Sequence, residues 1–374
     1  MTHEEAMALL VLTRALSYGR REAALLAAGG PLALVSEPEA YAAQLGAQGV
    51  SALRETVRCA PRLLCALAQD GVHLIARGGA GYPACLTQTR RPPHLLFARG
   101  RPDVADSFPV AMVGTRRASE YGLRHTHAIA AELARAGVCV VSGLALGIDA
   151  QAHRGALSVG GRTIAVLGGA LDRFYPEENR PLMERILEGG GTVITEYAPG
   201  TPPGRYSFLE RNRIIAGLSL GVVITEGGRR SGAQRTVREA LEEGREVFAL
   251  PGSVDSEVSA LPNSLIAEGA HLITCGRDVL RALVIEPGDT GLPPRAEPPS
   301  PAPAQARNDA PRTPPAGLDG PQRAVFDALL GGEADFDALC ERTGIPAHEL
   351  GALLTLMELD GLVVCRAGLN YALA

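Results

Sequence analysis

The chain has 374 residues, of which 46% are hydrophobic and 21% charged, a composition typical of a globular protein with two or three domains. No apolar run approaches the roughly 18 residues of a membrane-spanning helix, and the acidic start, Met1–Glu5, is unlike a signal peptide, so we expect a cytoplasmic protein. All 36 basic residues are arginine, which excludes Schiff-base chemistry and a P-loop lysine but leaves phosphate binding by arginine open.

Charge is distributed unevenly along the chain. The formal net charge is −5, but the residues from Leu318 onward carry nine acidic side chains against three arginines, which gives this tail −6 and the rest about +1. Within the rest, arginines cluster in residues 90–124 and 205–245. Such local patches leave a nucleic-acid partner open in spite of the acidic total. The seven cysteines form no CxxC pair and no zinc-finger spacing, so we expect reduced thiols and no metal site.

Residues 1–68 have apolar positions at helical spacing, interrupted by glycine and proline, and predict a small all-helical domain of the SAM or helix-hairpin kind. The expected helices are Glu4–Ser17, Arg21–Ala28, Pro38–Gln44 and Ser51–Gln69. In residues 69–285 short apolar runs alternate with amphipathic helices, which predicts an α/β domain with a Rossmann-like, doubly wound parallel sheet. The expected strands are Val110–Val113, Val138–Val141, Thr163–Leu167, Thr192–Thr195, Gly221–Thr225, Glu246–Leu250 and His271–Thr274.

The last 89 residues divide into a linker and a small domain. Residues 286–317 are rich in proline, alanine and arginine without periodicity, so they predict a semi-extended linker. Residues 318–374 predict a winged helix made of three helices and a hairpin. Its expected elements are Pro321–Leu330, Phe336–Arg342, Ala347–Leu359, Val363–Cys365 and Tyr371–Leu373, the last two around Ala367 and Gly368.

Several predicted strands end in turns that are rich in glycine and polar residues. These turns are Gly114–Arg117, Ser142–Asp149, Gly168–Asp172, Glu196–Gly200, and Glu226–Gly228 followed by Ser231-Gly232. The carboxyl ends of parallel strands share one edge of the sheet, and glycine lets backbone N–H groups approach an anion closely. Any single turn needs glycine simply to reverse the chain, but together, with Arg116 among them, they predict an anion site. No GxGxxG fingerprint follows the first strand, so we expect no nucleotide cofactor.

The stretch Gly204–Ser219 places basic and aromatic residues together at the start of a helix. Single-stranded nucleic acid needs this combination, a positive charge for its backbone and a ring face for a base. Phe208 shares a helix face with Ile215 and could instead belong to the core. Arg211 and Arg213 are two residues apart and point to different sides of a helix, so we expect at most one of them to face a phosphate and the other to brace the fold.

Together these stretches resemble the DNA-processing protein A family (DprA, also called Smf). The matching segments follow the family's order across most of residues 71–280; they are Val113–Arg116, Ser142–Asp149, Leu171-Asp172 with Tyr175-Pro176 and Asn179, Arg211–Ser219, Gly244–Gly252, and Asn263–Ile266 with Gly269-Ala270. The chain departs from the family pattern at Ala233–Thr236 and at Leu261-Pro262.

The resemblance implies a non-catalytic protein that binds single-stranded DNA, loads the RecA recombinase in transformation and recombinational repair, and forms a homodimer. It implies a DNA-binding pocket made of Gly114, Thr115, Arg116, Ser142, Gly143, Arg205, Phe208, Arg211, Asn212 and Gly232. It implies no catalytic residue, cofactor or metal.

Two other functions are compatible with parts of the sequence. Rossmann-like phosphoribohydrolases use a glycine-rich turn followed by threonine and glutamate, which Glu226–Gly228 with Thr236 and Glu239 loosely matches. Asp149 and His153 lie at i, i+4 and could form an acid–base pair, although a helix-capping carboxylate and a surface or packing histidine explain them better. A gene regulator acting through the winged helix is disfavoured, because its recognition helix, Ala347–Leu359, has no arginine and carries Glu349 and Glu358.

Overall fold

The structure is a computed structural model that describes residues 3–79, 81–101, 108–284, 318–330, 332, 334–366 and 370–373. Its contacts divide the chain into two compact units, Met1–Pro298 and Pro299–Ala374, each described here by itself. The predicted linker, residues 286–317, and the predicted wing residues Ala367 and Gly368 lie outside the described residues. The domain boundaries therefore stay predictions, whereas the predicted fold class is confirmed by the elements below.

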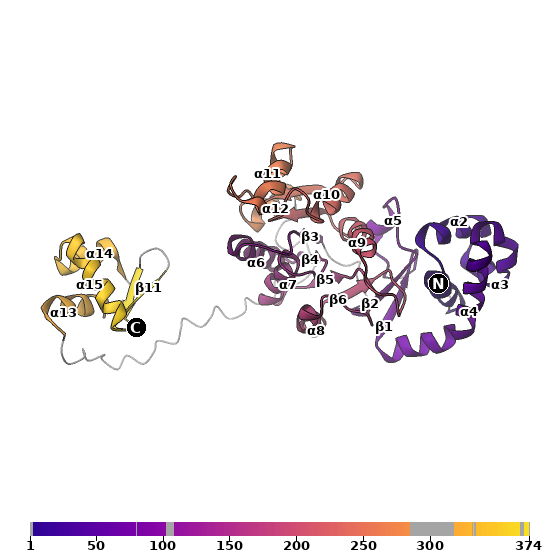
Figure 1. The fold of residues 1–374 in the computed structure, drawn as a ribbon, viewed down its shortest axis with the longest axis horizontal. Helices are drawn as coiled ribbons and strands as arrows, with labels where there is room; N and C mark the ends of the chain where they lie inside the picture. Colours follow the sequence, from indigo (N-terminus) through magenta and orange to yellow (C-terminus); the bar gives the residue numbers. More distant parts are fainter. Residues whose placement is uncertain are drawn as a thin grey trace. The chain divides into compact units, whose positions relative to one another are not determined.

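The N-terminal region is helical, as its apolar spacing predicts (Figure 1). Its helices are α1 (His3–Ala15), α2 (Tyr18–Ala28), α3 (Pro31–Ser36), the 3-10 helix η1 (Pro38–Tyr41) and α4 (Ala42–Gln69). The sequence did not predict α3, which begins with proline at its first position, where the ring's fixed φ suits a helix start. The sequence also predicted two separate helices, Pro38–Gln44 and Ser51–Gln69, where the structure has one helix, α4, from Ala42 onward. This helix has a kink at Gly46, whose φ of 70° lies in the left-handed region.

Within the described residues, the larger unit holds a nine-stranded sheet in the order β1-β2-β6-β5-β4-β3-β7-β8-β9. The seven predicted strands are β3 (Pro109–Val113), β4 (Cys139–Ser142), β5 (Thr163–Val166), β6 (Thr192–Thr195), β7 (Gly221–Ile224), β8 (Glu246–Ala249) and β9 (His271–Leu272), and all of them pair in parallel. Two strands were not predicted, β1 (Val72–Ala76) and β2 (Leu95–Gly100), which pair antiparallel with each other and extend the sheet beyond β6.

Helices cover both faces of the sheet (Figure 1). Alternate residues of β3 contribute to separate cores, Ala111 and Val113 to one and Val110 and Met112 to the other. The first core is covered by α5 (Ala84–Thr87), α9 (Arg205–Leu218), α10 (Ala233–Glu242) and α11 (Ala260–Ala267). The second is covered by α6 (Glu120–Arg135), α7 (Ile148–Ser158) and α12 (Gly276–Ala282). Short elements η2 (Glu177–Asn179), α8 (Arg180–Glu188) and η3 (Glu257–Ser259) complete the unit.

The strand order places a switch in chain direction between β3 and β7. From β3 the chain adds β4, β5 and β6 on one side, and then crosses back to add β7, β8 and β9 on the other. The loops that leave β3 and β7 consequently diverge to opposite faces and open a crevice at the carboxyl edge, where α/β proteins of this type bind ligands. The fold alone therefore indicates where a site should lie.

The helical region is joined to the sheet by a buried ion network. Glu196, just after β6, accepts hydrogen bonds from Arg21 on α2 (3.1 Å) and from Arg213 on α9. All three side chains are less than 10% exposed. The ring of Tyr18 lies 5.6 Å from the Arg21 guanidinium and 5.0 Å from that of Arg213. Arg213 thus braces the fold and does not face solvent. This agrees with the expectation that one arginine of the pair Arg211 and Arg213 braces the fold.

The second unit is a winged helix in its described part. It consists of α13 (Gly320–Leu329), β10 (Ala334–Asp335), α14 (Phe336–Thr343), α15 (Ala347–Leu359), β11 (Val363–Arg366) and β12 (Asn370–Leu373). Its strands form a sheet in the order β10-β12-β11, and its helices enclose an apolar core around Leu339, Leu350 and Met357. In neither unit does the structure describe a helix that is both long and apolar enough to cross a membrane.

Candidate functional site

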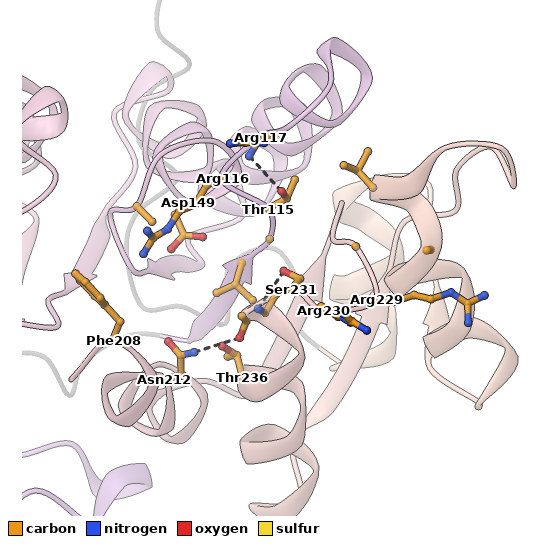
Figure 2. Close-up of a pocket in the computed structure, with 18 of the residues that line it drawn as sticks. Thr115, Arg116, Arg117, Asp149, Phe208, Asn212, Arg229, Arg230, Ser231 and Thr236 are labelled. Carbon is orange, nitrogen blue, oxygen red and sulfur yellow. Dashed lines mark hydrogen bonds between the residues drawn. The ribbon is translucent and has the colours of Figure 1, made fainter. Parts of the chain in front are cut away.

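An open pocket of about 1390 Å³ lies at the carboxyl ends of β3 and β7, the position that the strand order indicates. Figure 2 shows its lining residues coming from the loops after both strands, from the start of α9 and from α10. Six arginines line it, against three carboxylates, Asp149, Asp255 and Glu257. Eight of the ten predicted residues line this pocket: Gly114, Thr115, Arg116, Arg205, Phe208, Arg211, Asn212 and Gly232.

The loop after β3 is fixed by close backbone packing. The Thr115 N–H donates to the Glu226 carbonyl (2.9 Å), and the Ile148 N–H donates to the Thr115 carbonyl (3.2 Å). A Cβ on Gly114 would lie 2.5 Å from the Glu226 carbonyl oxygen. A Cβ on Gly147, whose φ is 75°, would collide with the Thr115 carbonyl. Glycine at both positions therefore lets the loops after β3, β4 and β7 meet and hold Arg116 at the pocket.

Arg116 is exposed and lies over the ring of Phe208, with 5.3 Å between its guanidinium carbon and the ring centroid. The Phe208 ring is also 5.9 Å from that of Tyr175, which is 52% exposed. Phe208 is partly exposed and lines the pocket, so it does not belong to the core. A cation and two rings thus meet on one side of the pocket, which suits the phosphate and the base of a nucleotide.

Arg211 lies in the floor of the pocket and is 5% exposed. Its guanidinium donates to the carbonyls of Gly143 (2.8 Å) and Val166, and its Nε to Asn212 Oδ1 (3.3 Å). Burial lowers the pKa of Arg211 to about 10, so it remains charged at neutral pH. Burial likewise raises the pKa of Asp149, although the charge of Arg211 and backbone N–H donors oppose that rise. Arg211 and Arg213 diverge as predicted, and the role of Arg211 toward a ligand stays a prediction.

The other two predicted residues contribute less directly. Ser142 is fully buried, and its hydroxyl donates to the Met112 carbonyl (2.6 Å), so its side chain does not line the pocket. Gly143 lines a small adjoining cavity of about 20 Å³, and its N–H donates to Asp149 (3.1 Å). The Asn212 amide lies at the pocket and donates to the Gly232 carbonyl (3.4 Å).

The sequence did not single out part of the wall opposite Phe208. This wall consists of Arg229, Arg230 and Ser231 after β7 and of residues 254–258 after β8, and of these only Ser231 belongs to a predicted turn. In Figure 2, Phe208 and Arg229 stand on opposite sides of the pocket, with Ser231 and Thr236 drawn between them. The available signal was that Arg229 and Arg230 directly follow a predicted strand end, Glu226–Gly228.

The groups that suggested an enzyme are engaged in the fold. The Glu226 carboxylate is 1% exposed and accepts hydrogen bonds from the Ser119 N–H (2.9 Å) and hydroxyl (2.5 Å). Glu239 forms ion pairs with Arg91 and Arg235. His153 is fully buried with its Nδ1 2.7 Å from Thr163 Oγ1, and burial lowers its pKa to about 3. His153 is therefore a packing residue, and Glu226 holds Ser119, the N-cap of α6.

Comparison with known proteins adds to this geometry. The family model of DNA recombination-mediator protein A matches residues 73–284, and that of the DprA winged helix domain matches residues 293–368. The chain belongs to the DNA recombination-mediator protein A family. It is 38% identical over 309 residues to Protein Smf of Escherichia coli, covering 82% of this chain and 78% of that protein. Over 199 residues it is 45% identical to DNA processing protein DprA of Streptococcus pneumoniae, covering 53% and 70%.

Two solved structures of the family also match. The Streptococcus pneumoniae DprA structure has a TM-score of 0.62 at 34% identity and covers 75% of this chain and 98% of that one. A Helicobacter pylori DprA structure, whose title concerns its single-stranded DNA binding mode, has a TM-score of 0.52 at 31% identity and covers 57% and 95%. Residues 73–284 include the whole pocket, so the site lies within the matched family domain.

Proposed function

We propose that this chain binds single-stranded DNA in the pocket at the ends of β3 and β7 and passes it to the RecA recombinase in transformation and recombinational repair. The observation that carries the proposal is the exposed Arg116 held over Phe208 beside Tyr175, at the switch point of the sheet. The proposal is supported by the Helicobacter pylori relative, whose structure title concerns binding of single-stranded DNA.

The geometry favours a single strand over a duplex. Exposed arginines at the rim, Arg116, Arg117 and Arg205, neutralise phosphates without reading sequence. The Phe208 and Tyr175 rings provide faces for unstacked bases, which a duplex does not present. Because these arginines are solvent-exposed, their contacts break readily in salt or in competition with another protein. A mediator needs this reversibility, since it has to release the strand to the recombinase.

We expect Phe208→Ala to weaken binding of an oligonucleotide by about 1–3 kcal/mol, the usual contribution of one base stacked on an aromatic ring. The variant also removes the ring under Arg116. Fluorescence anisotropy with a labelled single strand measures the loss, and a thermal melt is the control. If Phe208 mattered only for packing, affinity per folded molecule would be unchanged and the melting temperature would fall.

The nucleotide-processing alternative has a direct test. We expect no free base from nucleoside monophosphates incubated with the protein, because Glu226 is held by Ser119 and Glu239 by two arginines. Release of base above that of a Glu226→Gln variant would favour the enzyme. The homodimer that the family resemblance implies and the cytoplasmic location expected from the sequence belong to the same proposal, and light scattering tests the dimer.

We expect deletion of residues 318–374 to leave single-strand affinity within a few-fold of wild type, or to raise it. The deleted residues carry −6, and the two acidic side chains of α15, Glu349 and Glu358, are both exposed. Like charges would repel as this surface approached DNA, which favours a protein-binding or autoregulatory role. Titration of both forms at equal oligomeric state decides the point. A collapse of affinity in a folded truncation would show that the tail binds DNA.

A further inference from the structure

The pocket is larger than the proposed nucleotide contacts require. Its 1390 Å³ extend from Phe208 past the end of β3 to the loop after β7, residues Gly228–Gly232. The contacts proposed above, Arg116 with Phe208 and Tyr175, occupy one side only. Figure 2 shows Arg229 and Arg230 on the other side, with the Arg229 side chain extending away from Phe208. Something longer than one nucleotide would fill this space.

Arg229 and Arg230 are available to a ligand. Both side chains are exposed, and none of the carboxylates that the structure describes lies within 4.0 Å of either guanidinium. Asp255 and Glu257 line the same wall without pairing to them. These two carboxylates would repel a phosphate from the 254–258 loop, and so direct an anionic chain toward the arginines.

The loop that carries the two arginines is held in place. The Gly227 N–H donates to the Val258 carbonyl (2.6 Å), and the Gly227 carbonyl accepts from the Leu261 N–H (2.8 Å). The Ser231 N–H donates to the Gly228 carbonyl (2.9 Å), and the Ser231 hydroxyl accepts from the Ala233 N–H (3.2 Å). Phosphate binding would therefore order two side chains but not the backbone, which keeps its entropic cost low.

We propose that Arg229 and Arg230 form a second phosphate-binding subsite, so that a single strand crosses the pocket from Phe208 and leaves over the loop after β7. This inference rests on the proposed binding of single-stranded DNA. It assigns a direction to the strand and sets a minimum length, because a strand too short to cross the pocket reaches only one subsite.

The test is an affinity series with oligothymidylates from about 4 to about 16 nucleotides, the range of site sizes in single-strand-binding domains. The wild-type protein is compared with Arg229→Ala/Arg230→Ala and with the control Arg238→Ala, an exposed α10 arginine that does not line the pocket. For the long strands we expect the double variant to lose about tenfold in affinity, and its salt dependence to become shallower by about 0.7–1.4 in log K against log salt. The shortest strands should bind all three proteins alike.

Each other outcome has a separate meaning. If the double variant matches wild type at every length, or if it loses equally at every length with circular dichroism unchanged, there is no second subsite and the inference is wrong. If the wild-type protein itself fails to bind any single strand, the proposed function fails instead. Equal losses in Arg238→Ala would show a general charge effect and would also overturn the subsite.

Discussion

Replacing Glu196 with alanine is expected to lower the free energy of unfolding of the larger unit by about 3–5 kcal/mol, as breaking a buried ion pair usually does. Glu196 is the shared acceptor of Arg21 and Arg213, and all three side chains are less than 10% exposed. Its loss leaves two buried guanidinium groups close to each other without the carboxylate between them. The region affected joins the helical N-terminus to α9, the helix that carries Phe208.

Urea unfolding followed by circular dichroism measures this loss. Glu242→Ala is the matched control, because Glu242 pairs with Arg90 at the surface, where both partners are more than 40% exposed. Such an exposed pair contributes roughly 0–1 kcal/mol. If the two variants lose equally little, the network around Glu196 does not hold the helical region to the sheet.

Arg116→Ala is expected to weaken single-strand binding by about 1.5–3 kcal/mol, roughly a 10- to 150-fold loss, while the fold stays intact. Arg116 is exposed at the pocket, with its guanidinium over Phe208, so its removal deletes a charged contact to the ligand and no contact within the core. The salt dependence should become shallower by about 0.7, the contribution of one phosphate on a single strand.

Arg213→Ala is the informative comparison, because it removes an arginine from the same region but from the interior. Its guanidinium donates to Glu196 and to the Arg91 carbonyl (2.5 Å). We therefore expect this variant to lose stability and to bind normally at temperatures where it is folded. Titrating both variants with one oligonucleotide, with circular dichroism as the folding control, separates the roles. Equal affinity losses in two folded variants would contradict the assignment.

Much of the sheet could be predicted because its strands are short apolar runs separated by helices. The seven parallel strands lie close to the predicted ranges for this reason. The antiparallel strands β1 and β2 were missed because the helix between them, α5, has only four residues and is too short to show an amphipathic pattern. In addition, β2 pairs with β6. In this pair Phe97 of β2 lies opposite Thr195 of β6, which is almost one hundred residues away in the sequence. Local sequence carries no signal for such a distant antiparallel pair.

The site could be predicted to the level of the sheet edge but not of side-chain direction. The carboxyl ends of parallel strands lie at one edge of the sheet, so glycines and arginines that follow strands were expected to lie together there. Gly114, Arg116 and Gly232 line the pocket at this edge. Whether Ser142 points to the pocket or to the neighbouring strand depends on the register of β4 against β3, and it points to the Met112 carbonyl. Arg229 was not selected, because the way its loop folds against residues 254–258 depends on tertiary contacts.

The central claim is that the arginine-lined pocket binds single-stranded DNA through its backbone and its unstacked bases. The most direct measurement compares a single strand with a duplex of the same sequence, each titrated at several salt concentrations. Affinity should be higher for the single strand, with a slope of log K against log salt of about −2 to −3.5 if three to five phosphates are neutralised. A salt-independent affinity, or tighter binding of the duplex, would contradict the account.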